Sequence, residues 1–297
     1  MKRRDLLIGA LGATTIPDAL RALAQARPAG IRFGYAAITW GGNDRQAIDD
    51  VAALGFRGIQ LRGSAVTEWG ERPRELKELL ASRGLTLVAL SSGLMRSDAA
   101  FEAEDLATHV RNARFVREVG GLYLQVVDQR PRHRPAAGRD YTRMGRLLTE
   151  LGRRTADLGV PLGLHNHMGN LSQAPDEVAR VLDAADPRFV KLELDTAHYA
   201  QAGGDPAAAV ERYQNRLLFL HVKDLESPVP GRPADSYRFV ELGRGKLDFP
   251  AFFAALARAR FEGWAIVELD RVPDAARTPK ESGEIARRYL ESQGFTL

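Results

Sequence analysis

The chain has 297 residues, of which 44% are hydrophobic and 27% charged, and its formal net charge is +4. These values are typical of a globular protein, and no apolar run approaches the roughly 20 residues that a membrane span needs. Cysteine is absent, which excludes disulfides, thiolate metal ligands and a cysteine nucleophile. No basic run is interleaved with aromatic residues, so nothing favours a nucleic-acid groove.

The N-terminus differs in composition from the rest of the chain. Arg3 and Arg4 precede a mildly apolar stretch at 6–23, and Ala24-Gln25-Ala26 offers a small-x-small cleavage site. This arrangement resembles a twin-arginine export signal, although a frayed amphipathic helix is an alternative. We therefore expect residues 1–26 to be a cleavable signal, residues 27–297 to form the mature protein, and the protein to be periplasmic or secreted. Removal of the signal lowers the formal charge from +4 to +2.

From Ile31 onward, short β-rich apolar runs alternate with longer segments of helical periodicity, which is typical of repeated βα units and a parallel sheet. The eight predicted strands are 31–38, 58–62, 85–91, 122–127, 160–166, 190–195, 217–222 and 264–269. The helices predicted to follow them are 44–54, 71–82, 98–119, 141–158, 175–184, 206–212, 250–259 and 279–291.

Eight βα units can close into a barrel or spread as an open sheet, and two observations favour closure. No glycine fingerprint for a dinucleotide follows the first strand, and polar residues gather at the ends of many strands rather than at one switch point. We therefore predict a single-domain (β/α)₈ TIM barrel of the α/β class. Two long excursions, residues 129–139 and 227–248, are expected to lie over the strand ends and to shape a pocket there.

Four consecutive predicted strands end in imidazoles and carboxylates. The segments are His165-Asn166-His167, Glu193-Leu194-Asp195, His221-Val222-Lys223 and Glu268-Leu269-Asp270. Because side chains alternate along a strand, His165 and His167 share one face, and so do Glu193 and Asp195. Mixed nitrogen and carboxylate ligands suit Mn²⁺, Zn²⁺, Fe²⁺ or Co²⁺. We therefore predict one divalent metal ion in a shared cavity, with a purely structural polar network as the alternative.

These segments resemble the xylose-isomerase-like barrels, which include sugar epimerases, inosose dehydratases and the endonuclease IV group. The resemblance is carried by His165-Asn166-His167-Met168-Gly169, by Leu194-Asp195-Thr196-Ala197-His198, by His221-Val222-Lys223-Asp224 and by the glycine-rich segment at 242–249. It implies one metal ligand from each of strands five to eight, here His165, Asp195, His221 and Glu268. It also implies that His198 and Lys223 touch the substrate.

The fifth strand departs from the usual family pattern, because His165 stands where a metal-binding glutamate is common. The roles of His165 and His167 could therefore be exchanged, and the resemblance leaves the proton-transferring group open. We expect His167, Glu193 and Glu268 to serve as catalytic groups. Further substrate contacts are expected from Gln60, Gln125 and Trp40, which lie on or just after other predicted strands.

Such a site can remove a proton next to a carbonyl, with a metal stabilising the enediolate that forms. The main hypothesis is therefore a metal-dependent isomerase or epimerase of a free sugar or keto-sugar. The alternative is a dehydratase or lyase on a 3-keto-sugar or inosose, because the histidine-rich segment followed by Gln173, Pro175 and Glu177 resembles the inosose-dehydratase branch. An endonuclease-IV-like nuclease and a non-catalytic sugar-binding barrel are less favoured. Homo-oligomerisation stays open, and export favours an unphosphorylated substrate.

Overall fold

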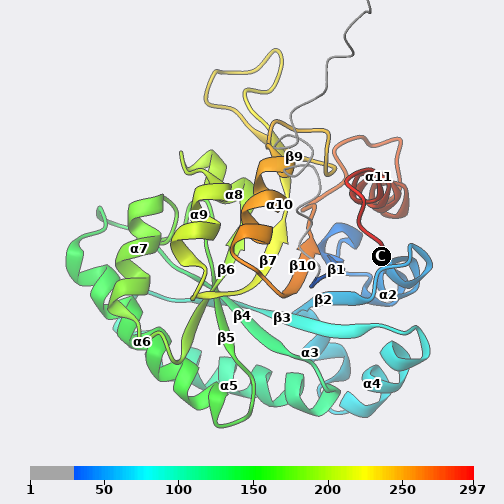
Figure 1. The fold of residues 1–297 in the computed structure, drawn as a ribbon. Coiled ribbons are helices and arrows are strands. Elements are labelled where there is room, and N and C mark those ends of the chain that lie inside the picture. Colours follow the sequence, from blue (N-terminus) through cyan, green and yellow to red (C-terminus); the bar gives the residue numbers. More distant parts are fainter. Residues whose placement is uncertain (1–29) are drawn as a thin grey trace, which may run out of the picture.

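The computed structural model describes residues 30–297, so the predicted export signal and its cleavage site lie outside the described residues. Eight parallel strands close into one barrel, in the order β1-β10-β7-β6-β5-β4-β3-β2 (Figure 1). The barrel strands are β1 (Ile31–Ala36), β2 (Gly58–Arg62), β3 (Thr86–Met95), β4 (Tyr123–Asp128), β5 (Leu162–His165), β6 (Val190–Asp195), β7 (Leu217–Val222) and β10 (Gly263–Val267). The predicted (β/α)₈ barrel is confirmed.

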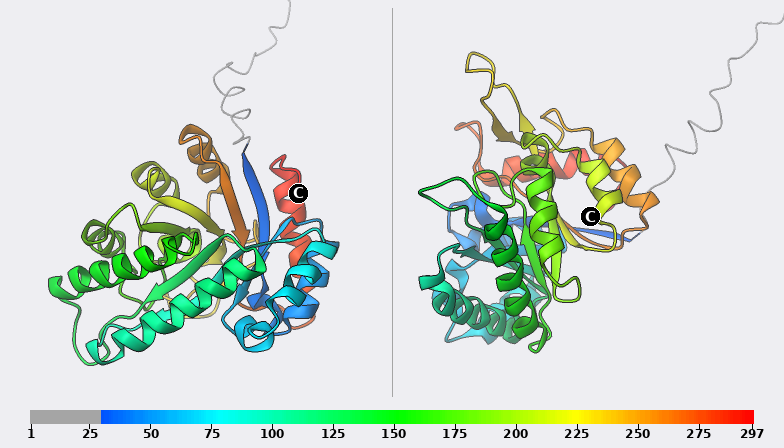
Figure 2. Two further views of the ribbon diagram at one scale, coloured as in Figure 1. Left: turned by 90° about the horizontal axis from the view of Figure 1, so that it is seen from below. Right: turned by 90° about the vertical axis from the view of Figure 1, so that its left-hand side faces the viewer.

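Helices surround the barrel, and the view from below shows them outside the strands (Figure 2). They are α2 (Asp44–Ala53), α3 (Ser64–Trp69), α4 (Pro73–Ser82), α5 (Glu102–Val119), α6 (Gly138–Ala156), α7 (Pro175–Ala184), α8 (Thr196–Gln201), α9 (Pro206–Tyr213), α10 (Phe249–Arg258) and α11 (Pro279–Ser292), with 3₁₀ turns η1 (Ala37–Trp40) and η2 (Ala99–Phe101). No helix among the described residues is both long and apolar enough to cross a membrane.

Differences from the predicted boundaries have local causes. The first strand ends at Ala36 rather than at residue 38, because the chain turns into η1. β3 runs on to Met95 because an irregularity between Ser91 and Leu94 shifts its register with β4 and lets pairing continue. The short helices α3 and α8 were not predicted, since six residues carry too little periodicity to be recognised.

The barrel interior is filled from one end by apolar side chains, which leaves its other end for polar groups. Ala36, Val88, Phe219, Trp264 and Ile266 form an inner cluster that is separate from the larger core between strands and helices. Gly58 makes room for it, because a Cβ there would lie 2.5 Å from both Trp264 and Val88. The interior is therefore packed, as expected for a barrel of eight strands.

A two-stranded antiparallel hairpin stands over the carboxyl ends of the strands. It is formed by β8 (Asp224–Glu226) and β9 (Arg238–Val240), and the connection between them projects beyond the barrel at the top of Figure 1. The connection between the two strands, β9 and the turns after β9 lie in the predicted excursion at 227–248, and β8 directly precedes it. The excursion therefore lies above the strand ends, as expected, but it contains a strand that the sequence analysis did not predict.

Candidate active site

The register of the sheet brings the polar residues of neighbouring strands to similar levels in the barrel. His165 of β5 is paired with Glu193 of β6, and Asp195 of β6 is paired with His221 of β7. All four side chains are buried. The alternation predicted from the sequence therefore places these groups inside the barrel, close to its carboxyl end.

Asp195, His221 and Glu268 form a candidate metal site, because their ligand atoms all lie within 4.8 Å of one another. Nδ1 of His221 is 3.6 Å from Oδ2 of Asp195 and 3.3 Å from Oε2 of Glu268. Both that nitrogen and that Asp195 oxygen are buried without a hydrogen-bond partner. Because unpartnered buried polar atoms are costly, a cation bound between them would resolve an unfavourable arrangement. The nitrogen and oxygen donors fit a borderline divalent ion.

The fourth expected ligand, His165, does not join this group in the described part of the chain. Its ligand atoms group instead with those of Glu193 and His221, or with those of His167 and His198. The ring of His165 packs edge-on against the ring of His221, with centroids 4.9 Å apart. This contact holds the imidazole beside His221, so the structure brings together three of the four predicted ligands.

Lys223 is a fully buried cation above the candidate metal site. Its Nζ donates to Glu268 at 2.9 Å and to Asp270 at 2.5 Å, and it lies 3.3 Å from Nε2 of His198. Burial acts to lower the pKa of Lys223, but the charges of Glu268, Asp195 and Asp270 raise it above its usual value. The ammonium group is therefore charged and fixed in place.

A pocket of about 440 Å³ opens at the barrel mouth. It is lined by His167, His198, Tyr237, Arg238, Phe239, Asp270, Arg271, Val272 and Pro273. The rings of His167 and His198 lie 3.8 Å apart. Nδ1 of His167 is 2.6 Å from the carbonyl oxygen of Met168, so this nitrogen carries the hydrogen and donates it. The other ring nitrogen, Nε2, is then free to accept a proton.

Phe239 and Tyr237 are pocket residues that the sequence analysis missed. The Phe239 ring lies 4.9 Å from the ring of His198, and its centroid is 4.0 Å from Nζ of Lys223. The exposed Tyr237 packs edge-on against Phe239. The only signal in the sequence was the presence of two aromatic residues in the excursion at 227–248.

Three residues expected to contact substrate, Trp40, Gln60 and Gln125, do not line the mouth pocket. Trp40 donates to Asp50 at 2.9 Å and packs edge-on against Tyr35, in the core outside the barrel. Oε1 of Gln60 lies 2.7 Å from Nε2 of His221. Gln125 is paired with a glycine two residues before His165, so it lies deeper in the interior.

Glu193 is also out of reach of a substrate in the mouth pocket, because its side chain has no exposed surface. Oε1 lies 2.5 Å from Nε2 of His221, and Oε2 lies 3.6 Å from Nδ1 of His165. Burial raises the pKa of Glu193 to about 7, although His221 opposes the shift. The geometry therefore does not support the expected acid/base contact between Glu193 and substrate. Of the three expected catalytic groups, only His167 lines the pocket, while Glu268 contacts His221 and Lys223 below it.

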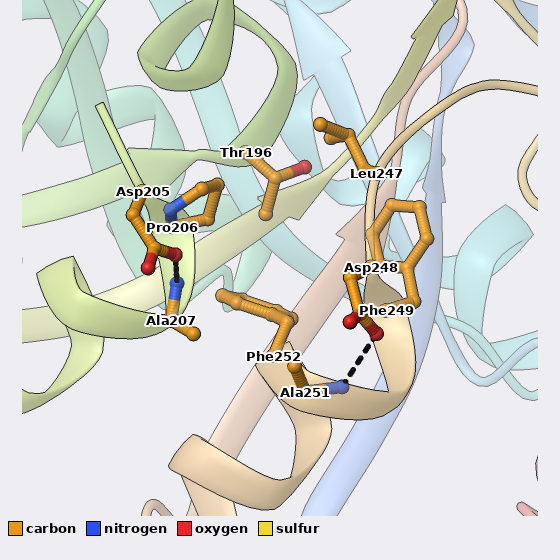
Figure 3. Close-up of a pocket in the computed structure, with 9 residues that line it drawn as sticks. All are labelled: Thr196, Asp205, Pro206, Ala207, Leu247, Asp248, Phe249, Ala251 and Phe252. Atoms are coloured by element: carbon orange, nitrogen blue, oxygen red, sulfur yellow. Dashed lines mark hydrogen bonds between the residues drawn. The ribbon is translucent and has the colours of Figure 1, made fainter. Parts of the chain in front are cut away.

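A second pocket, of about 290 Å³, lies between the first turns of α9 and α10 (Figure 3). Asp205 and Asp248 line it, but each already accepts a hydrogen bond from the backbone of the helix that it caps. The other lining residues are mostly apolar. The acid/base and metal-ligand groups therefore converge at the barrel mouth and not here.

The fold and these strand-end residues define an α/β barrel with a candidate metal site. The chain belongs to the xylose isomerase-like TIM barrel family, whose family model matches residues 48–292. It is 28% identical to the rhizopine catabolism protein MocC of Rhizobium meliloti, over 90% of this chain and 91% of that protein. It is 26% identical to an inosose dehydratase of Bacillus velezensis, over 89% of this chain and 96% of the relative. A crystal structure of the IOLI protein with a bound zinc atom has a TM-score of 0.76 and 17% identity, and covers 90% of this chain and 100% of that one.

Proposed function

We propose that the protein is a metal-dependent hydro-lyase that removes water from a cyclic keto-polyol, either an inosose or a 3-keto-sugar. The observation that carries this proposal is the similarity to an inosose dehydratase over 89% of the chain. This favours the dehydratase alternative of the sequence analysis over its main isomerase or epimerase hypothesis. The composition of the mouth, with a free imidazole nitrogen and a buried ammonium above a candidate metal site, supports the same reaction class.

Asp195, His221 and Glu268 are the residues that would hold the ion. The donor set suits Mn²⁺, Zn²⁺, Fe²⁺ or Co²⁺, and zinc is the metal named for the IOLI structure. When bound, such an ion polarises a substrate carbonyl and stabilises the negative charge that develops on its oxygen. The charged Lys223 lies next to these ligands and donates hydrogen bonds to Glu268 and to Asp270, and Asp270 lines the mouth pocket.

Within this proposal, His167 moves the proton. Its Nε2 accepts the proton from the carbon next to the ketone, because Nδ1 is committed to the carbonyl oxygen of Met168. The C–H electron pair forms the new double bond as the bond from the β-carbon to its hydroxyl breaks. The imidazolium then returns the proton to the departing hydroxyl, so water leaves and neutral His167 is restored.

Epimerisation would need a second proton-transferring group on the opposite face of the substrate. The fifth strand has no carboxylate for this task, because His165 stands there and is only 3% exposed. Glu193 has no exposed surface. Asp270 lines the pocket, but its carboxylate already accepts a hydrogen bond from Lys223. With one free imidazole facing the pocket, the site suits an elimination in which one group removes and returns the proton. Export of the protein, and hence an unphosphorylated substrate, stays part of the proposal.

The test is to incubate the metal-loaded protein in heavy water with a panel of inososes, 3-keto-sugars, aldoses and ketoses. We expect an inosose or 3-keto-sugar to lose the mass of one water. His167→Gln should lower kcat by about 10²- to 10⁴-fold, the usual contribution of a general base, with unchanged metal content. His133→Gln, at an exposed histidine in the loop before α6, is the matched control and should be fully active.

Two results would contradict the hydro-lyase. Deuterium incorporation with inversion or isomerisation, and without loss of water, would restore the epimerase or isomerase hypothesis. A wild-type protein that binds no metal and exchanges no proton with any member of the panel would instead support a non-catalytic barrel.

A further inference from the structure

We infer that Glu193 is a positioning residue. It orients the imidazole of His221 toward the candidate metal site and thereby raises the affinity of that site for a metal ion. This inference rests on the proposed metal-dependent function. It assigns to Glu193 a role other than the catalytic one expected from the sequence, and it explains why a fully buried carboxylate stands below the candidate site.

The first step is the hydrogen on His221. Its Nε2 lies 2.7 Å from Oε1 of Gln60 and 2.5 Å from Oε1 of Glu193. Both oxygens are acceptors, and a bare nitrogen lone pair at these distances would repel them, so Nε2 carries the hydrogen. In a neutral imidazole the lone pair then lies on Nδ1.

The second step is the direction of that lone pair. Nδ1 is the His221 nitrogen that lies 3.3 Å from Glu268 and 3.6 Å from Asp195. The two acceptor oxygens on the Nε2 side of the ring therefore favour the tautomer whose Nδ1 lone pair faces Asp195 and Glu268. A carboxylate in this position also makes the imidazole a stronger donor to a metal.

The third step is that Glu193 has no other task in the described part of the chain. Its charged contacts among the described residues are His221 and His165, and neither of its oxygens has a hydrogen-bond partner there. Asp128, an equally buried carboxylate on β4, differs because it accepts from both the backbone N–H and the hydroxyl of Ser172. A buried carboxylate whose partners are only the imidazoles of the site indicates a role in that site.

The position of Glu193 in the barrel agrees with this role. The chain carries histidine at the end of β5, and the paired residue on β6 is Glu193. Because β6 lies between β5 and β7, the carboxylate of Glu193 lies next to both His165 and His221, below the ring of His221. From there its side chain reaches the Nε2 side of the ring, which is opposite to the side that Asp195 and Glu268 occupy.

The experiment measures Co²⁺ affinity of the full chain by competition with a chelating dye, together with the visible spectrum of the Co²⁺ protein. We expect Glu193→Gln to weaken binding by about 10- to 100-fold, the usual effect of removing an outer carboxylate partner. The shape of the Co²⁺ spectrum should be unchanged, because the ligands themselves are retained. The metal-free variant should unfold at a denaturant concentration no lower than that of the metal-free wild type, since a buried charge has been removed.

Asp128→Asn is the matched control, and its Co²⁺ affinity should equal that of the wild type. Unchanged affinity in Glu193→Gln would overturn the inference. A changed Co²⁺ spectrum, with loss of binding as complete as in Asp195→Asn, would also overturn it, because Glu193 would then be a metal ligand. A wild-type protein that binds no Co²⁺ would be a failure of the proposed metal-dependent function itself.

Discussion

Asp195 shows how one side chain serves both local structure and the site. Oδ1 accepts a hydrogen bond from the backbone N–H of His198 at 2.8 Å and so caps α8, while Oδ2 faces His221. Because the cap fixes the first turn of the helix, it also places His198 beside the mouth pocket. The three-residue spacing between Asp195 and His198 therefore has a simple structural cause.

Replacing Asp195 by asparagine should separate these two functions. Asparagine caps helices as well as aspartate does, so the cap of α8 should be kept, and any loss in the free energy of unfolding of the metal-free protein should come from the missing charge beside Lys223. Metal binding should be lost, because the amide is a much weaker ligand than the carboxylate. Urea unfolding and elemental analysis of the purified protein measure the two effects. Asp205→Asn, which alters the cap of α9 in the same way, should keep its metal; retention of metal by Asp195→Asn would contradict the ligand assignment.

Among the elements, the β8–β9 hairpin depends on one carboxylate for its attachment. Asp224 accepts hydrogen bonds from the backbone N–H groups of four residues, which are Leu225, Gly243, Gly245 and Leu247. These bonds fasten the segment after β9 against β8, and β9 in turn supplies Phe239 to the pocket. The glycine-rich segment noted in the sequence is therefore a structural anchor of the pocket wall.

Gly245→Ala tests this anchor. A Cβ at this position would lie 2.1 Å from Oδ1 of Asp224 and 2.4 Å from the carbonyl oxygen of Leu225, so backbone must move. We expect a loss of about 1–3 kcal/mol in the free energy of unfolding, as for other overpacked sites. Gly138→Ala is the control, because no atom lies within 4 Å of its added Cβ. Equal urea midpoints for the two variants would show that the close approach is not needed.

At the scale of the whole molecule, the closed barrel buries the carboxylate of Asp128 at the end of β4, and this burial makes stability depend on pH. Burial raises the pKa of Asp128 from 3.8 to about 6, although hydrogen bonds from Ser172 oppose the shift. The folded protein therefore binds this proton more tightly than the unfolded chain does. The stabilisation is fully present below pH 3.8 and is lost as the pH rises through about 6.

Asp128→Asn should remove this dependence. Relative to the wild type, the free energy of unfolding of the variant should be about 2–3 kcal/mol higher at pH 7 than at pH 4, since one pKa unit corresponds to about 1.4 kcal/mol. Urea unfolding of both proteins at the two pH values measures the difference. If variant and wild type differed in free energy of unfolding by the same amount at both pH values, Asp128 would keep one protonation state over this range. That result would contradict the prediction.

Much of the fold could be predicted because its signals are local. The apolar runs of all eight barrel strands and the periodicity of the longer helices can be recognised within windows of ten to twenty residues. The same holds for Asp195, His221 and Glu268, whose strand-end positions follow from alternation along each strand. His165 was expected with them, but its direction depends on the ring of His221, which lies on a strand two positions away in the barrel.

The pocket residues show what could not be predicted. Phe239 reaches His198 and Lys223 only because β9 folds back on β8, and no local pattern predicted that short strand. Trp40 follows the first strand directly, yet it packs outside the barrel because Asp50 of α2 accepts a hydrogen bond from its indole. In both cases the deciding contact is made by a different element.

By itself, the sequence determined the succession of strands and helices, the closed barrel as their expected arrangement, and the residue types at the strand ends. These features depend on side-chain alternation and on helical periodicity, which act between near neighbours in the chain. The tertiary structure alone decided which imidazole nitrogen faces the carboxylates, which groups line the mouth, and that Glu193 lies behind His221. Such choices depend on contacts between residues far apart in sequence, such as Gln60 and His221, and only the closed barrel brings those residues together.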